Sequence, residues 1–224
     1  MLNSPLFWTL AAGIGALFGY ANPWGQLPAL ALLLPATFAA FGLAAPTGRL
    51  AFKRCWLAAS LGCLGCLAWV YWPVHHFGGV HWLLALPVPV LLAMAMACYH
   101  GFFGIAAHFA NRLAPLMAAA FLGLAWIAME LAQATLLSGF SWLTLSSAFV
   151  RWPVVVQAAS VIGAYGVSGV LAAGVCGLVL ATRSRLCLVL PVACGLVLLG
   201  FGWQRMENHA ETTPAHTVAI VQGN

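Results

Sequence analysis

Apolar residues occupy most of this chain in long runs that are separated by short polar connections. A helix that crosses the hydrocarbon core of a bilayer needs about 20 predominantly apolar residues. Seven runs reach or approach that length: residues 5–21, 27–45, 55–74, 82–110, 116–137, 153–181 and 186–203. The pattern therefore predicts an all-α fold in residues 1–203, a polytopic bundle of about seven transmembrane helices.

The pattern changes abruptly after Trp203. Residues 204–217 are mostly polar and predict a linker that leaves the membrane. Residues 218–221 read Val-Ala-Ile-Val, a short β-branched run that is typical of a strand. Because a lone strand has no partner here, residues 218–224 are interpreted as the first strand of a further domain.

Composition strengthens the membrane interpretation. Only 5% of the residues are charged and 64% are hydrophobic, whereas soluble domains carry about 25% charged residues. So few charges cannot cover a water-exposed surface, and lipid must surround most of the chain. The formal net charge of +5 does not indicate nucleic-acid binding, because the basic residues are scattered singly between apolar runs.

The basic residues instead predict an orientation. If the N-terminus is cytoplasmic, the second, fourth and sixth connections lie inside the cell. These connections hold six of the eight Lys and Arg residues: Arg49, Lys53, Arg54, Arg112, Arg183 and Arg185. Cytoplasmic loops carry an excess of Lys and Arg, so this orientation is favoured over its opposite. Seven spans then place the C-terminal tail on the outer side.

Glu130 is the one acidic residue inside a predicted span. Placing an Asp, Lys or Arg at the bilayer centre costs about 2.5–3.5 kcal/mol on insertion scales, and such residues usually face a bundle interior or a wet cavity. Gln133 follows one turn later, within reach of a hydrogen bond. Glu130 is therefore either a polar anchor in a substrate cavity or a structural residue that fixes helix packing.

Aromatic residues gather at the predicted outer ends of two spans. Gly139 permits a turn after the fifth span, and the rings of Phe140 and Trp142 suit the headgroup level. Trp69 and Tyr71 end the third span on the same side. The residues alone favour an ordinary aromatic belt. The alternative is that these rings line a path for lipid chains.

The sequence contains no complete catalytic set. Asp is absent, and no Gly-rich phosphate loop, HExxH motif or nucleophile elbow occurs. His75, His76 and His81 share one outer loop, but their spacing matches no zinc motif. Cys63 and Cys66 lie inside an apolar run, where a free thiol behaves as a small hydrophobe. We therefore expect no metal and no cofactor.

Several blocks, in order, resemble the membrane domain of bacterial apolipoprotein N-acyltransferases. Trp69-Val70-Tyr71 and then Phe77-Gly78-Gly79 resemble that family's outer loop after the third helix. Glu130, followed by Leu-Ser-Gly-Phe-Ser-Trp-Leu at 137–143, resembles its Glu and Thr/Ser-Gly-Phe-Pro-Trp-Leu block. Residues 218–224 resemble the opening strand of its nitrilase-like domain.

Two positions depart from the family pattern. Ser141 stands where the family usually has Pro, which implies a less rigid loop. Gln133 stands where an Arg is common, which removes a charge partner for Glu130. The Glu-Lys-Cys triad of the family's nitrilase-like domain would lie beyond Asn224, so the resemblance carries over no catalytic residue.

The resemblance implies an acyltransferase that works in two steps. A thiolate takes a fatty acyl chain from a phospholipid, and the α-amine of a diacylglyceryl-cysteine lipoprotein then attacks the thioester, which is covalent nucleophilic catalysis. The implied partners are the phospholipid donor, the lipoprotein, membrane lipid and a nitrilase-like domain, either missing from this fragment or encoded separately. The implied location is the bacterial inner membrane, with no role for nucleic acid.

This chain alone is expected to be inactive and to anchor the catalytic domain, present lipid and shape the cavity. The expected substrate-binding residues are Glu130 and an outer rim beneath the active site, made by Trp69, Tyr71, Phe77, Gly139, Phe140 and Trp142.

The residues alone leave two other functions open. A small transporter would place Glu130 in a proton or solute path, and would predict inverted repeats or broken helices. No clear repeat is visible, although Pro87 and Pro89 interrupt the fourth span. A membrane scaffold would have no substrate. Binding of lipid or lipopeptide favours the acyltransferase, and proton-coupled flux favours the transporter.

Overall fold

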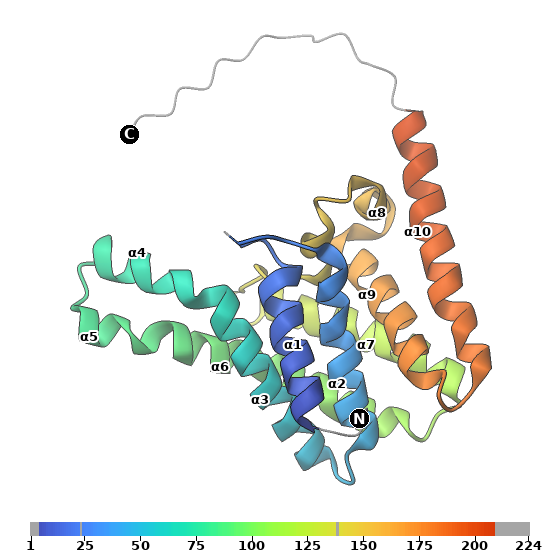
Figure 1. Cartoon of the computed structure of the whole chain (residues 1–224), viewed down its shortest axis with the longest axis horizontal. Helices are drawn as coiled ribbons and strands as arrows, with labels where there is room; N and C mark the ends of the chain where they lie inside the picture. Colours follow the sequence, from blue (N-terminus) through green and yellow to red (C-terminus); the bar gives the residue numbers. More distant parts are fainter. Residues whose placement is uncertain (1–4, 23, 138, 209–224) are drawn as a thin grey trace.

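The computed structural model describes residues 5–22, 24–137 and 139–208. All regular secondary structure in these ranges is helical, and the helices form a bundle from which one arm projects (Figure 1). The all-α prediction is confirmed for this part of the chain. The strand predicted at 218–221 and most of the predicted linker lie outside the described residues.

Five helical segments are long and apolar enough to cross a membrane. Their elements are α3 (Gly48–Leu67) with η2 (Ala68–Val70) and α4 (Tyr71–His76), α5 (Trp82–Ala85) with α6 (Pro87–Ala110), α7 (Pro115–Thr135), α9 (Ala159–Leu180), and η4 (Arg185–Leu188) with α10 (Val189–Glu207). The last helix runs four residues past the boundary that the sequence placed at 203.

Two further apolar segments are shorter. They are α1 (Pro5–Gly19), and η1 (Pro28–Leu32) continued by α2 (Leu33–Ala44). The 15 residues of α1 make a helix about 22 Å long at 1.5 Å per residue, against a hydrocarbon core of about 30 Å. Length and composition therefore support five crossings directly, and the predicted number of seven depends on these two.

The run predicted as a single span at 153–181 is broken in the structure. A short helix, α8 (Pro153–Val156), precedes α9. Gly163, inside α9, has φ 72° and ψ 168°, a backbone conformation that L-residues with a side chain rarely adopt. The extra length of this run is thus a separate turn of helix followed by a kink.

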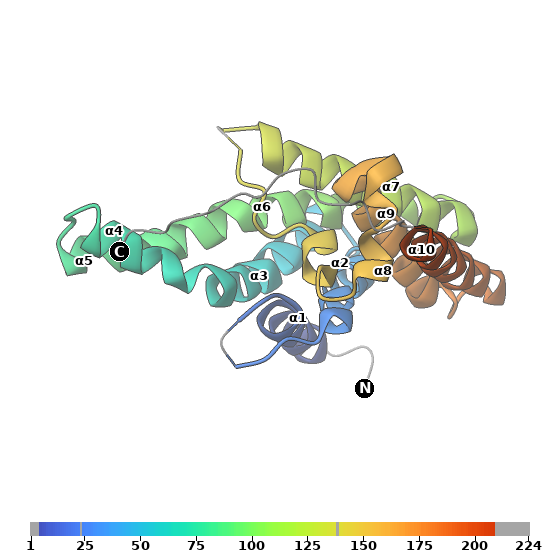
Figure 2. The ribbon, with the colours of Figure 1, turned by 90° about the horizontal axis from the view of Figure 1, so that it is seen from above.

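Helices α3 and α6 pack along each other, and α7 packs against α9. The largest fully buried side chains include Trp126, Phe38 and Leu122, which join α2 and α7 in one core. The outer ends of the α3 and α6 hairpin, with α4 and α5, extend sideways from the other helices in both views (Figures 1 and 2). The turn between α4 and α5 is therefore remote from the core.

Small residues allow the close contact between α7 and α9. A Cβ atom added to Gly123 would lie 2.7 Å from Cβ of Ala173 and 2.8 Å from the carbonyl oxygen of Gly169. Inside a bilayer, such close backbone approach is a main source of helix association, because lipid chains compete with apolar side chains.

We predict that Gly123→Leu destabilises the bundle by about 1–3 kcal/mol, the usual cost of overpacking. The measurement is thermal unfolding of the purified chain in detergent. Gly195→Leu in α10 is the matched control, because a Cβ atom there meets no other atom within 4 Å. Equal unfolding temperatures for the two variants would contradict the close α7–α9 contact.

Candidate functional site

The side chain of Glu130 is buried inside the bundle, with 1% of its surface exposed. It belongs to α7, and its Oε1 accepts two hydrogen bonds. The indole Nε1 of Trp126, one turn earlier, donates at 2.8 Å, and the backbone N–H of Leu145 donates at 2.6 Å. Leu145 begins the 3-10 helix η3 (Leu145–Phe149). Glu130 therefore ties the segment that returns after α7 to the middle of the bundle.

The second carboxyl oxygen, Oε2, is buried and has no hydrogen bond of good geometry among the described residues. Ser168 of α9 is near enough to interact with the carboxyl group. The Ser168 hydroxyl oxygen also accepts the backbone N–H of Ser146 at 2.9 Å. Side chains from α7 and α9 thus satisfy two consecutive backbone donors at the start of η3.

We call residues 136–152, between α7 and α8, the return segment. Three other backbone groups among its described residues also bond to the bundle. The N–H of Phe140 donates to the carbonyl oxygen of Gln133 at 2.8 Å, and the hydroxyl of Tyr20 donates to the carbonyl oxygen of Leu143 at 3.1 Å. The amide of Gln26 donates to the carbonyl oxygen of Ala148 at 2.9 Å. The segment is therefore anchored from both sides of the bundle.

Gly139 is required where the return segment leaves α7. Its φ is 78°, a left-handed conformation, and a Cβ atom there would clash with the carbonyl oxygen of Ala134. This tight turn directs Phe140 back toward the bundle, where it packs against the small apolar cluster of Cys63, Leu67, Ala93 and Met96. The predicted turn at Gly139 is thus present.

Three of the predicted rim residues meet at this end of the bundle. The rings of Trp69 and Trp142 lie 5.3 Å apart between centroids, and those of Phe140 and Trp142 lie 6.3 Å apart. Trp69 is 48% exposed and Trp142 is 64% exposed. We call Trp69, Phe140 and Trp142 the aromatic cluster. It joins the end of α3 to the return segment and presents indole faces to the surroundings.

The other predicted residues lie apart from the aromatic cluster. Tyr71 stacks on His75 along α4, with 5.6 Å between ring centroids. Phe77 lies at the turn of the arm and is 85% exposed. Glu130 is sealed inside the bundle and lies beneath the return segment. The structure thus separates one buried anchor, one aromatic cluster and one exposed arm, which the sequence had grouped together.

The predicted hydrogen bond between Glu130 and Gln133 is wrong for the described residues. The Gln133 amide instead donates to Sδ of Met96 at 3.5 Å, while Glu130 binds Trp126 and Leu145. The reason is geometric, because Gln133 points toward α6 and Glu130 points toward η3 and α9.

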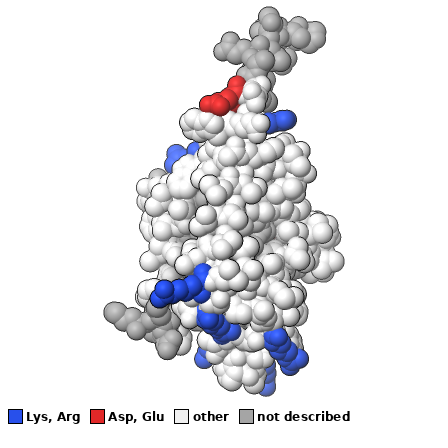
Figure 3. Space-filling view, turned by 90° about the vertical axis from the view of Figure 1, so that its right-hand side faces the viewer, with Lys and Arg blue, Asp and Glu red and all other residues white. Residues whose placement is uncertain are grey.

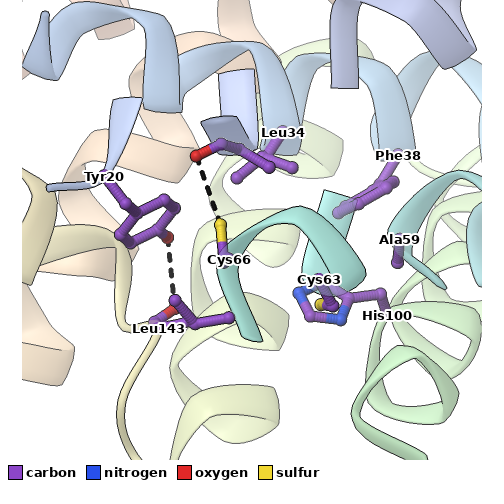
Figure 4. Close-up of a pocket in the computed structure, with 9 residues that line it drawn as sticks. Tyr20, Leu34, Phe38, Ala59, Cys63, Cys66, His100 and Leu143 are labelled. Carbon is purple, nitrogen blue, oxygen red and sulfur yellow. Dashed lines mark hydrogen bonds between the residues drawn. The ribbon is translucent and has the colours of Figure 1, made fainter. Parts of the chain in front are cut away.

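A cavity of about 20 Å³ lies between α1, α2, α3, α6 and the return segment (Figure 4). That volume suits about one water molecule. Its lining includes Tyr20, His100 and the thiols of Cys63 and Cys66. Tyr20 reaches Leu143, and Sγ of Cys66 lies 3.3 Å from the carbonyl oxygen of Ala16. Nδ1 of His100 lies 3.3 Å from the carbonyl oxygen of Met96.

Sequence reasoning missed two of these cavity residues, Tyr20 and His100. His100 offered a signal, as a polar residue in the middle of an apolar run, whereas nothing in the sequence places Tyr20 opposite Leu143. Within the described ranges, no group of three or more His, Cys, Asp or Glu residues is arranged to hold a metal ion.

Comparison with known proteins identifies the family. The family model described as the apolipoprotein N-acyltransferase N-terminal domain matches residues 12–178. The chain belongs to this family. The match includes Glu130, the return segment and the aromatic cluster, so the geometry described above is that of an apolipoprotein N-acyltransferase N-terminal domain.

Curated relatives carry the same family name. An apolipoprotein N-acyltransferase of Bordetella bronchiseptica is 30% identical over 224 aligned positions, which cover 90% of this chain and 40% of the relative. That of Coxiella burnetii is 31% identical over 186 positions, 78% of this chain and 37% of the relative. That of Verminephrobacter eiseniae is 32% identical over 181 positions, 74% and 32% respectively. The chain thus spans less than half the length of these relatives.

We predict that Glu130→Ala lowers the free energy of unfolding by about 1–3 kcal/mol, because it leaves buried N–H donors of Leu145 and Trp126 without an acceptor. Glu130→Gln keeps one carbonyl oxygen for both donors and is the conservative control. Thermal unfolding in detergent measures both variants. A Glu130→Ala protein as stable as the Gln variant would show that the carboxyl group does not hold the return segment.

Proposed function

We propose that this chain is the membrane part of an apolipoprotein N-acyltransferase and that its aromatic cluster contacts the lipid substrates at the outer end of the bundle. The observation that carries this proposal is that Phe140 and Trp142 belong to the return segment. Its backbone is held by hydrogen bonds to the side chains of Glu130 and Ser168. Exposed indole rings on a rigid support suit acyl chains near the headgroup level, where Trp is enriched.

The two substrates proposed are a phospholipid acyl donor and a diacylglyceryl lipoprotein. In the proposed reaction a thiolate accepts the acyl chain, and the lipoprotein α-amine then attacks the thioester. The seven cysteines of the chain lie in the apolar helices of the bundle, and we propose that none of them is this thiolate. We therefore propose that it belongs to a nitrilase-like domain that begins near residues 218–224 or is supplied by a separate chain.

The positions of the first and last helix ends support a reaction on the outer side of the membrane. The beginning of α1 and the end of α10 lie at opposite ends (Figure 1), as seven crossings require. With six basic residues in the second, fourth and sixth connections, the positive-inside rule places the end of α10 on the outer side of the inner membrane. We propose this orientation together with the seven crossings.

The alternative of a transporter that uses Glu130 receives less support. A proton or solute path would need an accessible carboxyl group, but Glu130 is 1% exposed and is not among the residues that line the cavity of about 20 Å³. Its hydrogen bonds go to the protein itself. They favour the structural interpretation of this residue, as the anchor of the return segment.

The sharpest test places this chain in the position of the matched segment of the Bordetella bronchiseptica relative and measures acyl transfer to a diacylglyceryl lipopeptide. The proposal predicts transfer by the chimera and none by residues 1–224 alone. A well-folded chimera that leaves the lipopeptide unmodified would refute the proposed function.

Within the chimera, Trp142→Ala is expected to slow acyl transfer up to about tenfold, because lost ring contacts are worth about 0.5–1.5 kcal/mol. Trp142→Phe should retain most of the rate. Trp24→Ala removes an exposed indole outside the aromatic cluster and serves as the control. The idea fails if Trp142→Ala turns over like the Trp24 variant at equal amounts of folded protein.

A further inference from the structure

One end of the bundle carries a concentrated positive charge, and the described residues at this end include no acidic side chain. The three connections at this end, the first turns of α3 and the start of η4 hold six cations: Arg49, Lys53, Arg54, Arg112, Arg183 and Arg185. None of the three Glu residues of the chain occurs in them, and Asp is absent. Figure 3 shows Lys and Arg side chains gathered at this end without an acidic neighbour on the visible face.

Arg183 is held in a fixed position within this end. Its guanidinium donates to Oδ1 of Asn111 at 2.6 Å and to the carbonyl oxygen of Leu43 at 3.4 Å. Asn111 in turn donates to the same Leu43 carbonyl oxygen at 3.0 Å. These bonds join the connections after α2, α6 and α9. Both partners of Arg183 are uncharged, so its positive charge is held in place without being neutralised.

The guanidinium of Arg183 has donors left for a ligand. Arginine has five N–H donors arranged as a planar fork, and the contacts to Asn111 and Leu43 use two of them. The side chain is exposed at the surface. Because Asn111 has already restricted the rotamers of Arg183, an incoming anion would cost less side-chain entropy than it would at a free arginine.

Arg112 brings a second guanidinium next to Asn111 in the sequence. It lies over the ring of Phe109, 5.1 Å from the ring centroid. A ring face attracts the cation but does not neutralise it. Arg183 thus binds the Asn111 side chain, and Arg112 follows Asn111 in the same connection. Guanidinium groups suit the bidentate recognition of phosphate, for which Arg is preferred.

The position of these connections relative to the membrane favours a lipid headgroup as the source of the phosphate. The three connections are short, namely residues 45–47, 111–114 and 181–184, so their side chains stay close to the ends of membrane-crossing helices. That level is the headgroup region, where anionic phospholipids attract juxtamembrane Lys and Arg and occupy basic pockets between helices.

We propose that Arg183 and Arg112 bind the headgroup phosphate of an anionic phospholipid in the leaflet that this end faces. Arg183 supplies the fixed fork, Arg112 adds a second guanidinium from the connection after α6, and the other cations of this end attract the anionic lipid. This site lies at the opposite end of the bundle from the aromatic cluster. It is independent of the proposed acyl transfer.

The test measures the thermal unfolding of the purified chain, and native mass spectrometry of bound lipid, with phosphatidylglycerol and with phosphatidylcholine. Phosphatidylglycerol is expected to raise the unfolding temperature more. Arg183→Gln and Arg112→Gln should each weaken phosphatidylglycerol binding about fivefold, the equivalent of one charge near an anionic surface. Arg205→Gln, which removes a cation from α10, is the matched control and should bind like the wild type.

Two variants separate the fork of Arg183 from its charge and from its part in folding. Arg183→Lys keeps the charge without the fork and should bind less tightly than the wild type. Should Arg183→Gln fail to fold, Arg112→Gln tests the same site without breaking the Asn111 and Leu43 bonds. Equal stabilisation by both lipids, equal losses in the Arg112 and Arg205 variants, or the same stabilisation by soluble glycerol phosphate would each overturn the proposal.

Discussion

The structure depends on one constraint, that backbone polar groups inside a lipid-embedded bundle must find partners within the protein. Regular helices meet this requirement themselves, but the return segment between α7 and α8 does not. Its start at η3 is satisfied by Oε1 of Glu130, which accepts the N–H of Leu145 at 2.6 Å, and by the hydroxyl of Ser168. Irregular backbone is tolerated at this depth because a buried carboxyl group supplies the acceptor.

This constraint links the buried anchor to the exposed cluster. With Leu145 held by Glu130, and with Leu143 held by Tyr20, which directly follows α1, the intervening backbone has little freedom. Trp142, one residue earlier, is thereby set beside Trp69 at the end of α3. The bundle thus carries a firmly held aromatic cluster with no charged residue in it, and Glu130 remains buried.

The sequence predicted the all-helical fold because a long apolar run satisfies its backbone in lipid only as a helix, and five of the seven runs are helices long and apolar enough to cross a membrane. It also identified Glu130 as unusual, but not its partner, since a backbone N–H fifteen residues later leaves no signal in residue type. Residue types do not reveal spatial partners. For this reason the sequence wrongly predicted a hydrogen bond between Gln133 and Glu130, and it grouped Tyr71 and Phe77 with Trp142. Helix ends near one another in sequence separate in space when α4 and α5 lean away from the bundle. The kink at Gly163 could not be predicted either, because a glycine in the sequence does not reveal whether its φ is positive.

The central claim, that the return segment is held inside the bundle as firmly as the helices around it, can be tested on the unmodified chain by hydrogen–deuterium exchange. The account predicts that the amides of Leu145 and Ser146 exchange as slowly as those in the middle of α7 and α9, while the amides of Gly78 and Gly79 in the arm exchange fast. Exchange at Leu145 and Ser146 as fast as in the arm would contradict it, since an open segment could not position the aromatic cluster.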